Sequence, residues 1–201
     1  MKLYFFLLRL LSPLARFVFR VTWRGTEHIP QSGPLIVCCN HRCVIDPLFL
    51  AAPFRRQVRY MAKSELFEDH GRLAAWLLNH LGAFPVERDK GDASSVRKAL
   101  EILAQGGVLG IFPQGRVIFD TSPFRPKPGF ALLAEKSGAP VLPVSIYCSG
   151  EPLRWRSRVT VRFGTPIPAQ ELLGGETGRA ALRCASARLS AEINGLLEEG
   201  H

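Results

Sequence analysis

The chain has 201 residues, of which 47% are hydrophobic, which suits one large folded domain and excludes a chain that is disordered throughout. Lys and Arg number 26 against 17 Asp and Glu, so the net charge is +9. We expect a polyanionic partner, and charge alone leaves nucleic acid, anionic lipid headgroups and a phosphorylated substrate as alternatives.

Residues 1–23 are rich in Leu, Phe and Val, but Arg residues interrupt them. No apolar run approaches the roughly 20 residues of a spanning helix, and Arg9 in the apolar stretch argues against a cleaved signal peptide. The basic residues Lys2, Arg9, Arg16 and Arg20 fall on one side of a helix, which Pro13 is expected to kink. We predict an amphipathic helix region over residues 1–24 that lies in a membrane interface. The alternative is a helix docked on the core with a solvated basic edge.

Beyond residue 30, apolar strand patterns alternate with helical ones. The expected strands are 35–39, 58–62, 84–86, 108–112, 141–147 and 159–163, and the expected helices are 46–52, 66–81, 94–105, 129–137 and 177–197. This alternation predicts an α/β domain over residues 25–201, with a mostly parallel sheet flanked by helices. In such sheets the loops at the carboxyl ends of the strands hold the ligand.

Cysteines are crowded around the first of these loops. Three of the five, Cys38, Cys39 and Cys43, lie within six residues, together with His41. Neighbouring residues of a strand point to opposite faces, which argues against a zinc site. The odd number argues against a disulfide framework, so we interpret the cysteines as small buried apolar residues in a reducing compartment.

His41 and Asp46 are the candidate catalytic residues. His41 follows the strand 35–39, and Asp46 with Pro47 begins the next helix. A tight turn can bring the carboxylate back to one ring nitrogen, which leaves the other nitrogen to take a proton from a hydroxyl group. The structural alternative is that Asp46 only caps its helix and His41 is a loop histidine.

Four blocks of the sequence resemble, in order, those of the 1-acylglycerol-3-phosphate and glycerol-3-phosphate acyltransferases. They are Asn40-His41 with Asp46, Gly82-Ala83-Phe84-Pro85-Val86-Glu87-Arg88, Phe112-Pro113-Gln114-Gly115-Arg116-Val117-Ile118, and Val141-Leu142-Pro143-Val144-Ser145-Ile146. Any one block is a weak signal, but the ordered set over residues 30–165 is specific.

The resemblance implies a mechanism of direct transfer. His41 acts as general base and Asp46 as its orienting partner, and the co-substrate is the thioester of acyl-CoA or of acyl carrier protein, with no metal or other cofactor. The implied acceptor is a lyso-glycerolipid, most directly 1-acyl-sn-glycerol-3-phosphate, at the cytoplasmic face of an anionic membrane to which the enzyme is bound as a peripheral or monotopic protein. The residues assigned to substrate binding are Arg88, Gln114, Gly115, Arg116 and Lys127, with Arg125 as a further candidate for an anionic headgroup.

The third block departs from the family pattern. Gln114 stands where Glu is usual, Arg116 replaces Thr, and Val117 and Ile118 replace Arg and Ser. These changes leave open a different lyso-lipid acceptor, or a non-catalytic lipid-binding relative, although the intact His41 and Asp46 argue against the latter. We expect no nucleic-acid partner, because no helix-turn-helix signal and no aromatic-basic strand motif is present.

Overall fold

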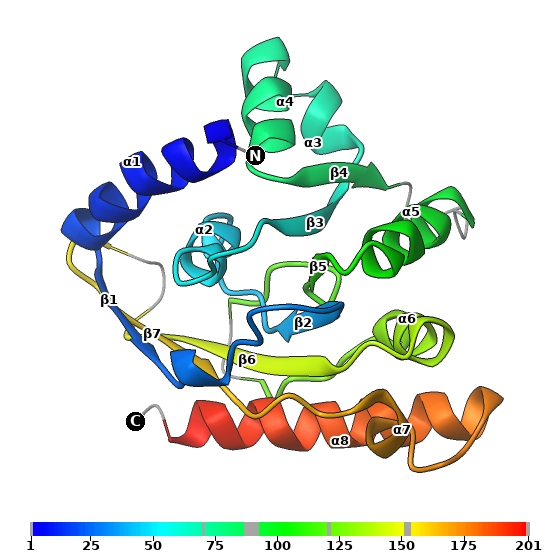
Figure 1. Cartoon of the computed structure of the whole chain (residues 1–201). Coiled ribbons are helices and arrows are strands. Elements are labelled where there is room, and N and C mark those ends of the chain that lie inside the picture. Colours follow the sequence, from blue (N-terminus) through cyan, green and yellow to red (C-terminus); the bar gives the residue numbers. More distant parts are fainter. Residues whose placement is uncertain (1, 70, 87–92, 120–121, 151–153, 200–201) are drawn as a thin grey trace.

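The computed structural model describes residues 2–69, 71–86, 93–119, 122–150 and 154–199. These residues form a seven-stranded sheet in the order β1-β7-β6-β2-β5-β3-β4, parallel except for the antiparallel β6–β7 pair (Figure 1). The strands are β1 Arg20–Arg24, β2 Leu35–Cys39, β3 Val58–Lys63, β4 Ala83–Val86, β5 Val108–Ile111, β6 Val141–Cys148 and β7 Arg158–Phe163. The α/β fold predicted from the sequence is therefore confirmed.

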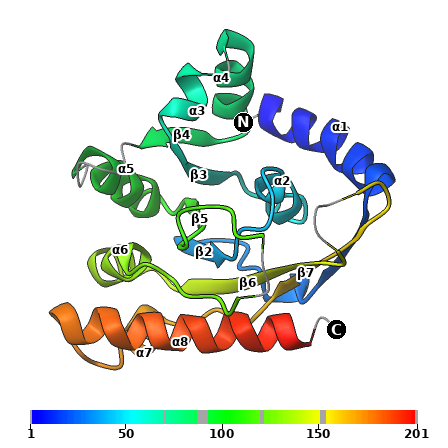
Figure 2. The same ribbon diagram turned by 180° about the vertical axis from the view of Figure 1, so that it is seen from behind.

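Helices cover both faces of the sheet. They are α1 Lys2–Val18, α2 Asp46–Ala51, α3 Glu65–Glu68, α4 Gly71–His80, α5 Ala93–Ala104, α6 Gly129–Ser137, α7 Ala169–Leu172 and α8 Gly178–Glu198, with a 3₁₀ turn at Thr26–His28. Helices α1 and α2 pack on one face, and α5, α6, α7 and α8 pack on the other. Seen from behind, α5 and α6 lie side by side and α8 runs along β6 (Figure 2).

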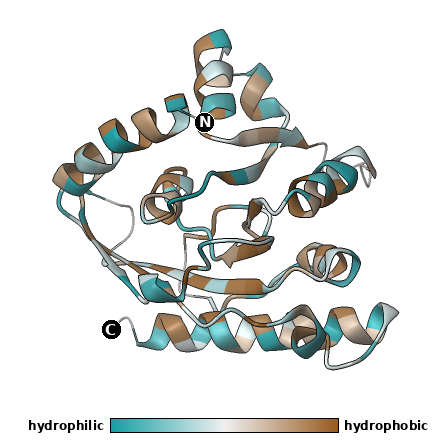
Figure 3. Cartoon of the chain, in the orientation of Figure 1, coloured by the Kyte–Doolittle hydropathy of each residue, from teal (hydrophilic) through white to brown (hydrophobic). Residues whose placement is uncertain are grey.

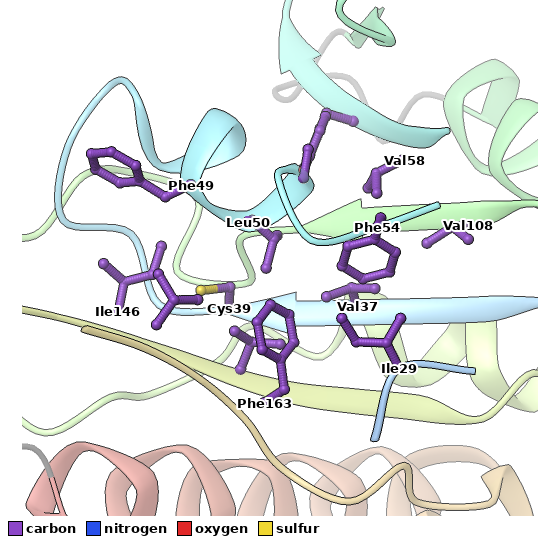
Figure 4. Close-up of a cluster of buried hydrophobic side chains, with 14 of the residues drawn as sticks. Ile29, Val37, Cys39, Phe49, Leu50, Phe54, Val58, Val108, Ile146 and Phe163 are labelled. Carbon is purple, nitrogen blue, oxygen red and sulfur yellow. The ribbon is translucent and has the colours of Figure 1, made fainter. Parts of the chain in front are cut away.

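Strand β2 lies in the middle of the sheet and is buried along its whole length. Leu35, Val37 and Cys39 point into the core beneath α2, where Figure 4 shows Val37 and Cys39 with Leu50 and Phe54. Ile36 and Cys38 point into the opposite core. The adjacent thiols therefore face opposite sides, as the pleat of a strand requires, and cannot bind one ion together.

Apart from the short helix α7, which the sequence did not predict, two elements differ from the sequence expectation. The helical prediction was wrong for Arg20–Arg24, which form the edge strand β1, paired in parallel with β7. Val21, Thr22 and Trp23 favour a strand over a helix, and the Trp23 Nε1–H donates to the carbonyl of Phe49 at 2.8 Å. The single helix predicted over 66–81 is divided into α3 and α4, because Gly71 adopts a left-handed φ of 77°.

Helix α1 runs without a break through Pro13, and its buried side is distinct from an exposed apolar side. Tyr4, Leu8 and Ala15 pack into the core on the side of α2. A second side exposes a row of apolar residues spaced three or four positions apart, and Figure 3 shows apolar colour along this helix. The row, here called the α1 apolar stripe, consists of Leu3, Phe6, Leu10, Leu14 and Phe17. Among the described residues, no helix has the length and apolar character needed to cross a bilayer.

Candidate active site

His41 lies just beyond the carboxyl end of β2, where its loop is tied to the neighbouring strand. Asn40 is almost fully buried, and its side-chain amide pairs with both backbone groups of Ile146 in β6. Oδ1 accepts from the Ile146 N–H at 2.7 Å and Nδ2 donates to the Ile146 carbonyl at 2.9 Å. The amide thus continues the β2–β6 ladder by one rung, which gives the following His41 a rigid support.

Asp46 is fully buried and its carboxylate points back toward His41. Oδ2 accepts a hydrogen bond from His41 Nδ1 at 2.8 Å and from the backbone N–H groups of Arg42 and Cys43. Ile45 is the N-cap residue of α2, and no side chain caps that helix. The carboxylate therefore organises the loop before it, so the helix-cap alternative does not describe this structure.

The second carboxylate oxygen of Asp46, Oδ1, accepts a hydrogen bond from the Cys43 thiol, whose Sγ lies 2.8 Å away. Burial raises the pKa of the Cys43 thiol, and the neighbouring Asp46 carboxylate raises it further. A thiol that stays protonated is a hydrogen-bond donor and a poor nucleophile. Cys43 therefore acts as a partner of Asp46, a contact that sequence inspection did not anticipate.

The imidazole ring of His41 is held at its edge by the hydrogen bond to Asp46 and on its face by Phe112. The Phe112 ring stacks on it with a centroid distance of 4.2 Å and an interplanar angle of 23°. Because a carboxylate only accepts hydrogen bonds, Nδ1 carries the proton in the His41–Asp46 contact and Nε2 remains the acceptor. The His41 side chain is 18% exposed, so a substrate hydroxyl can reach it.

A cleft of about 540 Å³ lies beside this pair. Four of the five residues that the sequence assigned to substrate binding line it, and Arg125 joins them. The lining residues are Gln114, Gly115, Arg116, Ile118, Ser122, Pro123, Arg125 and Lys127. The fifth assigned residue, Arg88, falls outside the described residues.

Gly115 lines the cleft in a backbone conformation that favours glycine. Its φ of 77° is a left-handed conformation that side chains disfavour, and a Cβ here would lie 3.3 Å from Lys127 Nζ. Lys127, Arg116 and Arg125 bring three positive charges to one concave surface, and no carboxylate in the described part of the chain pairs with them. Such a surface suits an anionic ligand.

Two hydrogen bonds join the cleft directly to His41. The Gln114 side-chain oxygen accepts from the His41 backbone N–H at 2.9 Å, and the Ile118 N–H donates to the His41 carbonyl at 2.8 Å. A carboxylate oxygen could make the first of these contacts as well as an amide oxygen can. The Gln that replaces the usual Glu therefore keeps the link between the third block and the base.

Metal-binding groups and cysteine thiols are further kinds of functional group that could lie near this site. In the part of the chain that the structure describes, no group of three or more His, Cys, Asp or Glu side chains could hold a metal ion. All five cysteines are free. Burial raises the pKa of Cys148 to about 12, with Asp46 as a second cause.

A His–carboxylate pair beside a basic cleft, at the carboxyl ends of parallel strands, can activate a hydroxyl group next to an anionic ligand. Comparison with known proteins agrees: the chain belongs to the Acyltransferase family, whose model matches residues 20–147, and it is an acyltransferase. The resemblance read from the four sequence blocks is thus confirmed.

Two bacterial relatives are named 1-acyl-sn-glycerol-3-phosphate acyltransferases. The Bacillus subtilis protein is 29% identical over 146 residues, covering 70% of each chain. The Streptococcus pneumoniae protein is 30% identical over 184 residues, covering 88% of this chain and 66% of its own. The crystal structure of the 1-acyl-sn-glycerophosphate acyltransferase PlsC from Thermotoga maritima superposes with a TM-score of 0.68 at 23% identity, covering 89% of this chain and 71% of that one, so the two share a fold.

Proposed function

We propose that this enzyme moves a fatty acyl group from the thioester of acyl-CoA or acyl carrier protein to the free hydroxyl of 1-acyl-sn-glycerol-3-phosphate, which yields phosphatidic acid for phospholipid biosynthesis. The observation that carries the proposal is the 2.8 Å contact between His41 Nδ1 and buried Asp46, beside a cleft lined by three cations. The names of the bacterial relatives support the same acceptor.

The transfer takes place in two stages. His41 Nε2 takes the proton of the acceptor hydroxyl as its oxygen attacks the thioester carbonyl carbon, and Asp46 stabilises the imidazolium that forms. The tetrahedral intermediate then collapses with cleavage of the C–S bond, and the imidazolium returns its proton to the departing thiolate. The thiol and the new ester leave, and His41 is neutral again.

The cleft is the proposed site for the phosphate of the acceptor. Arg116, Arg125 and Lys127 supply charge there, and a guanidinium group can bind two phosphate oxygens at once. A lyso-lipid without a terminal phosphate is the second candidate acceptor, favoured by the altered third block alone. The Gln114–His41 contact weakens this alternative, because Gln114 performs a role that does not depend on the acceptor.

The α1 apolar stripe is the proposed contact with the membrane that contains the acceptor. Phe6 and Leu10 are each 61% exposed, and the basic residues Lys2, Arg9 and Arg16 form an exposed row on the same helix. An apolar stripe flanked by a basic row is typical of a helix that lies in the interface of an anionic membrane. We place the enzyme on the cytoplasmic face, where both soluble acyl donors are available.

The test is an assay of the purified enzyme with vesicles that contain either 1-acylglycerol-3-phosphate or 1-acylglycerophosphocholine, and with each acyl donor in turn. We expect phosphatidic acid from the first acceptor and little product from the second. His41→Ala should lower the rate about 10²-fold or more, the usual contribution of a general base. His80→Ala is the matched control, because the contacts of this half-buried ring in the described part of the chain are with Trp76 of its own helix.

Activity of His41→Ala within a few-fold of the wild type would overturn the mechanism. Equal or better use of the choline lipid would favour the alternative acceptor instead. Circular dichroism and thermal melting of both variants show whether the fold is kept.

A further inference from the structure

The cleft cations Arg125 and Lys127 lie in the segment between β5 and α6, whose described residues form no helix or strand. A segment of this kind depends on contacts from other elements to keep one conformation. Within the segment, the Lys127 N–H donates to the Pro113 carbonyl at 2.9 Å. Near the cleft cations, a contact with another element is made at Phe124, the residue immediately before Arg125.

Phe124 is attached to α8 through both of its backbone groups. Its N–H donates to Asn194 Oδ1 at 2.8 Å, and its carbonyl accepts from Asn194 Nδ2 at 3.2 Å and from Ser190 Oγ at 2.6 Å. Asn194 Nδ2 also contacts Ser190 Oγ at 3.2 Å, which joins the two side chains. The Phe124 ring itself is 1% exposed, packed in the core on the α8 side of the sheet.

The same kind of pairing holds the catalytic loop. Asn40 binds both backbone groups of Ile146, and Asn194 binds both backbone groups of Phe124. A side-chain amide used in this way replaces a rung of a β ladder where no strand is available. One amide therefore fixes the residue before His41, and the other fixes the residue before Arg125.

Helix α8 is a suitable anchor because it is itself rigidly packed. Ala181, Ala185, Leu189 and Ile193 are fully buried along it, and the helix packs on β6. Neither Ser190 nor Asn194 is among the residues that line the cleft. Both also lie beyond residues 20–147, the segment that the family model matches.

We infer that Ser190 and Asn194 are positioning residues for the anionic group of the acceptor, which act by fixing Phe124 so that Arg125 and Lys127 line the cleft. This inference rests on the proposed function for the identity of the acceptor. The inference assigns to helix α8 two residues that determine the affinity for the acceptor. Neither residue touches the substrate, so the effect is on binding of the acceptor and not on the chemistry at His41.

The experiment compares Ser190→Ala and Asn194→Leu with Ser186→Ala in the full-length enzyme. Ser186 is a matched control, because its hydroxyl donates at 2.8 Å to Leu182 in its own helix and contributes nothing to Phe124. Loss of one or two hydrogen bonds at Phe124 should raise the KM for 1-acylglycerol-3-phosphate roughly 2- to 10-fold. The KM for the acyl donor and kcat should stay within about twofold, and the Ki of sn-glycerol 3-phosphate as a competitor should rise with the acceptor KM.

A second readout does not depend on activity. Chymotrypsin cuts after Phe, and the Phe124–Arg125 bond should be cleaved faster in the two variants than in the wild type and in Ser186→Ala, because opening of the anchor exposes the ring. Faster cleavage with a selective rise in the acceptor KM supports the inference. Unchanged cleavage, or a donor KM and kcat that change as much as the acceptor KM, would overturn it.

These experiments distinguish failure of the proposed function from failure of the positioning role of Ser190 and Asn194. If the wild-type enzyme does not acylate the phosphate-bearing lipid, the proposed function is wrong. The positioning role is then decided by cleavage at Phe124 together with binding of inorganic phosphate, measured by calorimetry. Weaker phosphate binding in Ser190→Ala and Asn194→Leu would support it, and equal binding would exclude it.

Discussion

At the scale of single residues, the contacts of Asp46 separate two roles of its carboxylate. Oδ2 accepts from two backbone N–H groups and from His41, while Oδ1 faces the Cys43 thiol. The backbone contacts shape the loop, and the negative charge supports the imidazolium that would form during transfer. A substitution that preserves shape but removes charge can therefore separate the two.

Asp46→Asn is that substitution. The two backbone donors should hold the amide oxygen in the Oδ2 position, which keeps the tautomer of His41 and places the amide nitrogen near the weakly accepting Cys43 sulfur. We expect kcat to fall by about 10²-fold, since only the stabilising charge is lost. Steady-state kinetics and thermal melting measure the two effects. A lower melting temperature with unchanged kcat would mean that Asp46 serves the loop alone.

The sequence predicted the residues of this pair but not all of their partners. The spacing of His41 and Asp46 is a local pattern, so it can be recognised without the fold. The stacking of Phe112 and the amide pairing of Asn40 bring together segments up to 106 residues apart. No local pattern contains that information. Arg88 stays a prediction, because it lies outside the described residues.

At the scale of elements, α1 combines the two alternatives that its sequence left open. Tyr4, Leu8 and Ala15 dock on the core, while the α1 apolar stripe and the basic row remain at the surface. A helix with one stripe facing a core needs only about three or four apolar residues in two turns. The excess of apolar residues in α1 is what fills the second, exposed stripe.

Phe6→Ser with Leu10→Ser tests this stripe. Both side chains are largely exposed, so the fold should be kept, while vesicle binding should weaken by about tenfold or more because apolar area is no longer buried in the bilayer. Vesicle flotation measures the binding. Charge reversal at Arg9 and Arg16 should weaken binding to anionic vesicles at low salt only, because salt screens surface charge.

Charge reversal at Arg179 and Arg183 is the control for the basic row. These exposed residues lie on α8, which runs along the opposite side of the molecule from α1 (Figure 1). If all these variants bind vesicles like the wild type, the α1 apolar stripe is not the membrane contact.

At the scale of the whole molecule, the N-terminal segment does not end where its amphipathic pattern suggests. The last five residues of the expected helix region form β1, which pairs with β7 over five residues and completes the edge of the sheet. The family match also begins at residue 20, the first residue of β1. The N-terminal region of residues 1–24 therefore includes β1, a strand of the sheet.

Truncation distinguishes the two parts of this segment. Removal of residues 1–24 should lower the melting temperature more than removal of residues 1–18, because the longer deletion also removes β1 and exposes buried Val159 and Val161. Uncovering these side chains costs roughly 1.5–3 kcal/mol for each one that becomes fully exposed. Differential scanning calorimetry measures the difference. Equal melting temperatures would show that β1 is dispensable for the sheet.

The sequence by itself determined the alternation of strands and helices, the order of the four blocks and the pairing of His41 with Asp46. These features follow from local periodicity and from residue types at short spacing, which a chain carries before it folds. Only the tertiary structure decided that Arg20–Arg24 join the sheet as an edge strand, and that α8 holds Phe124 beside the cleft. Both depend on contacts between distant segments, whose free energy comes from burial and pairing that exist only in the folded chain.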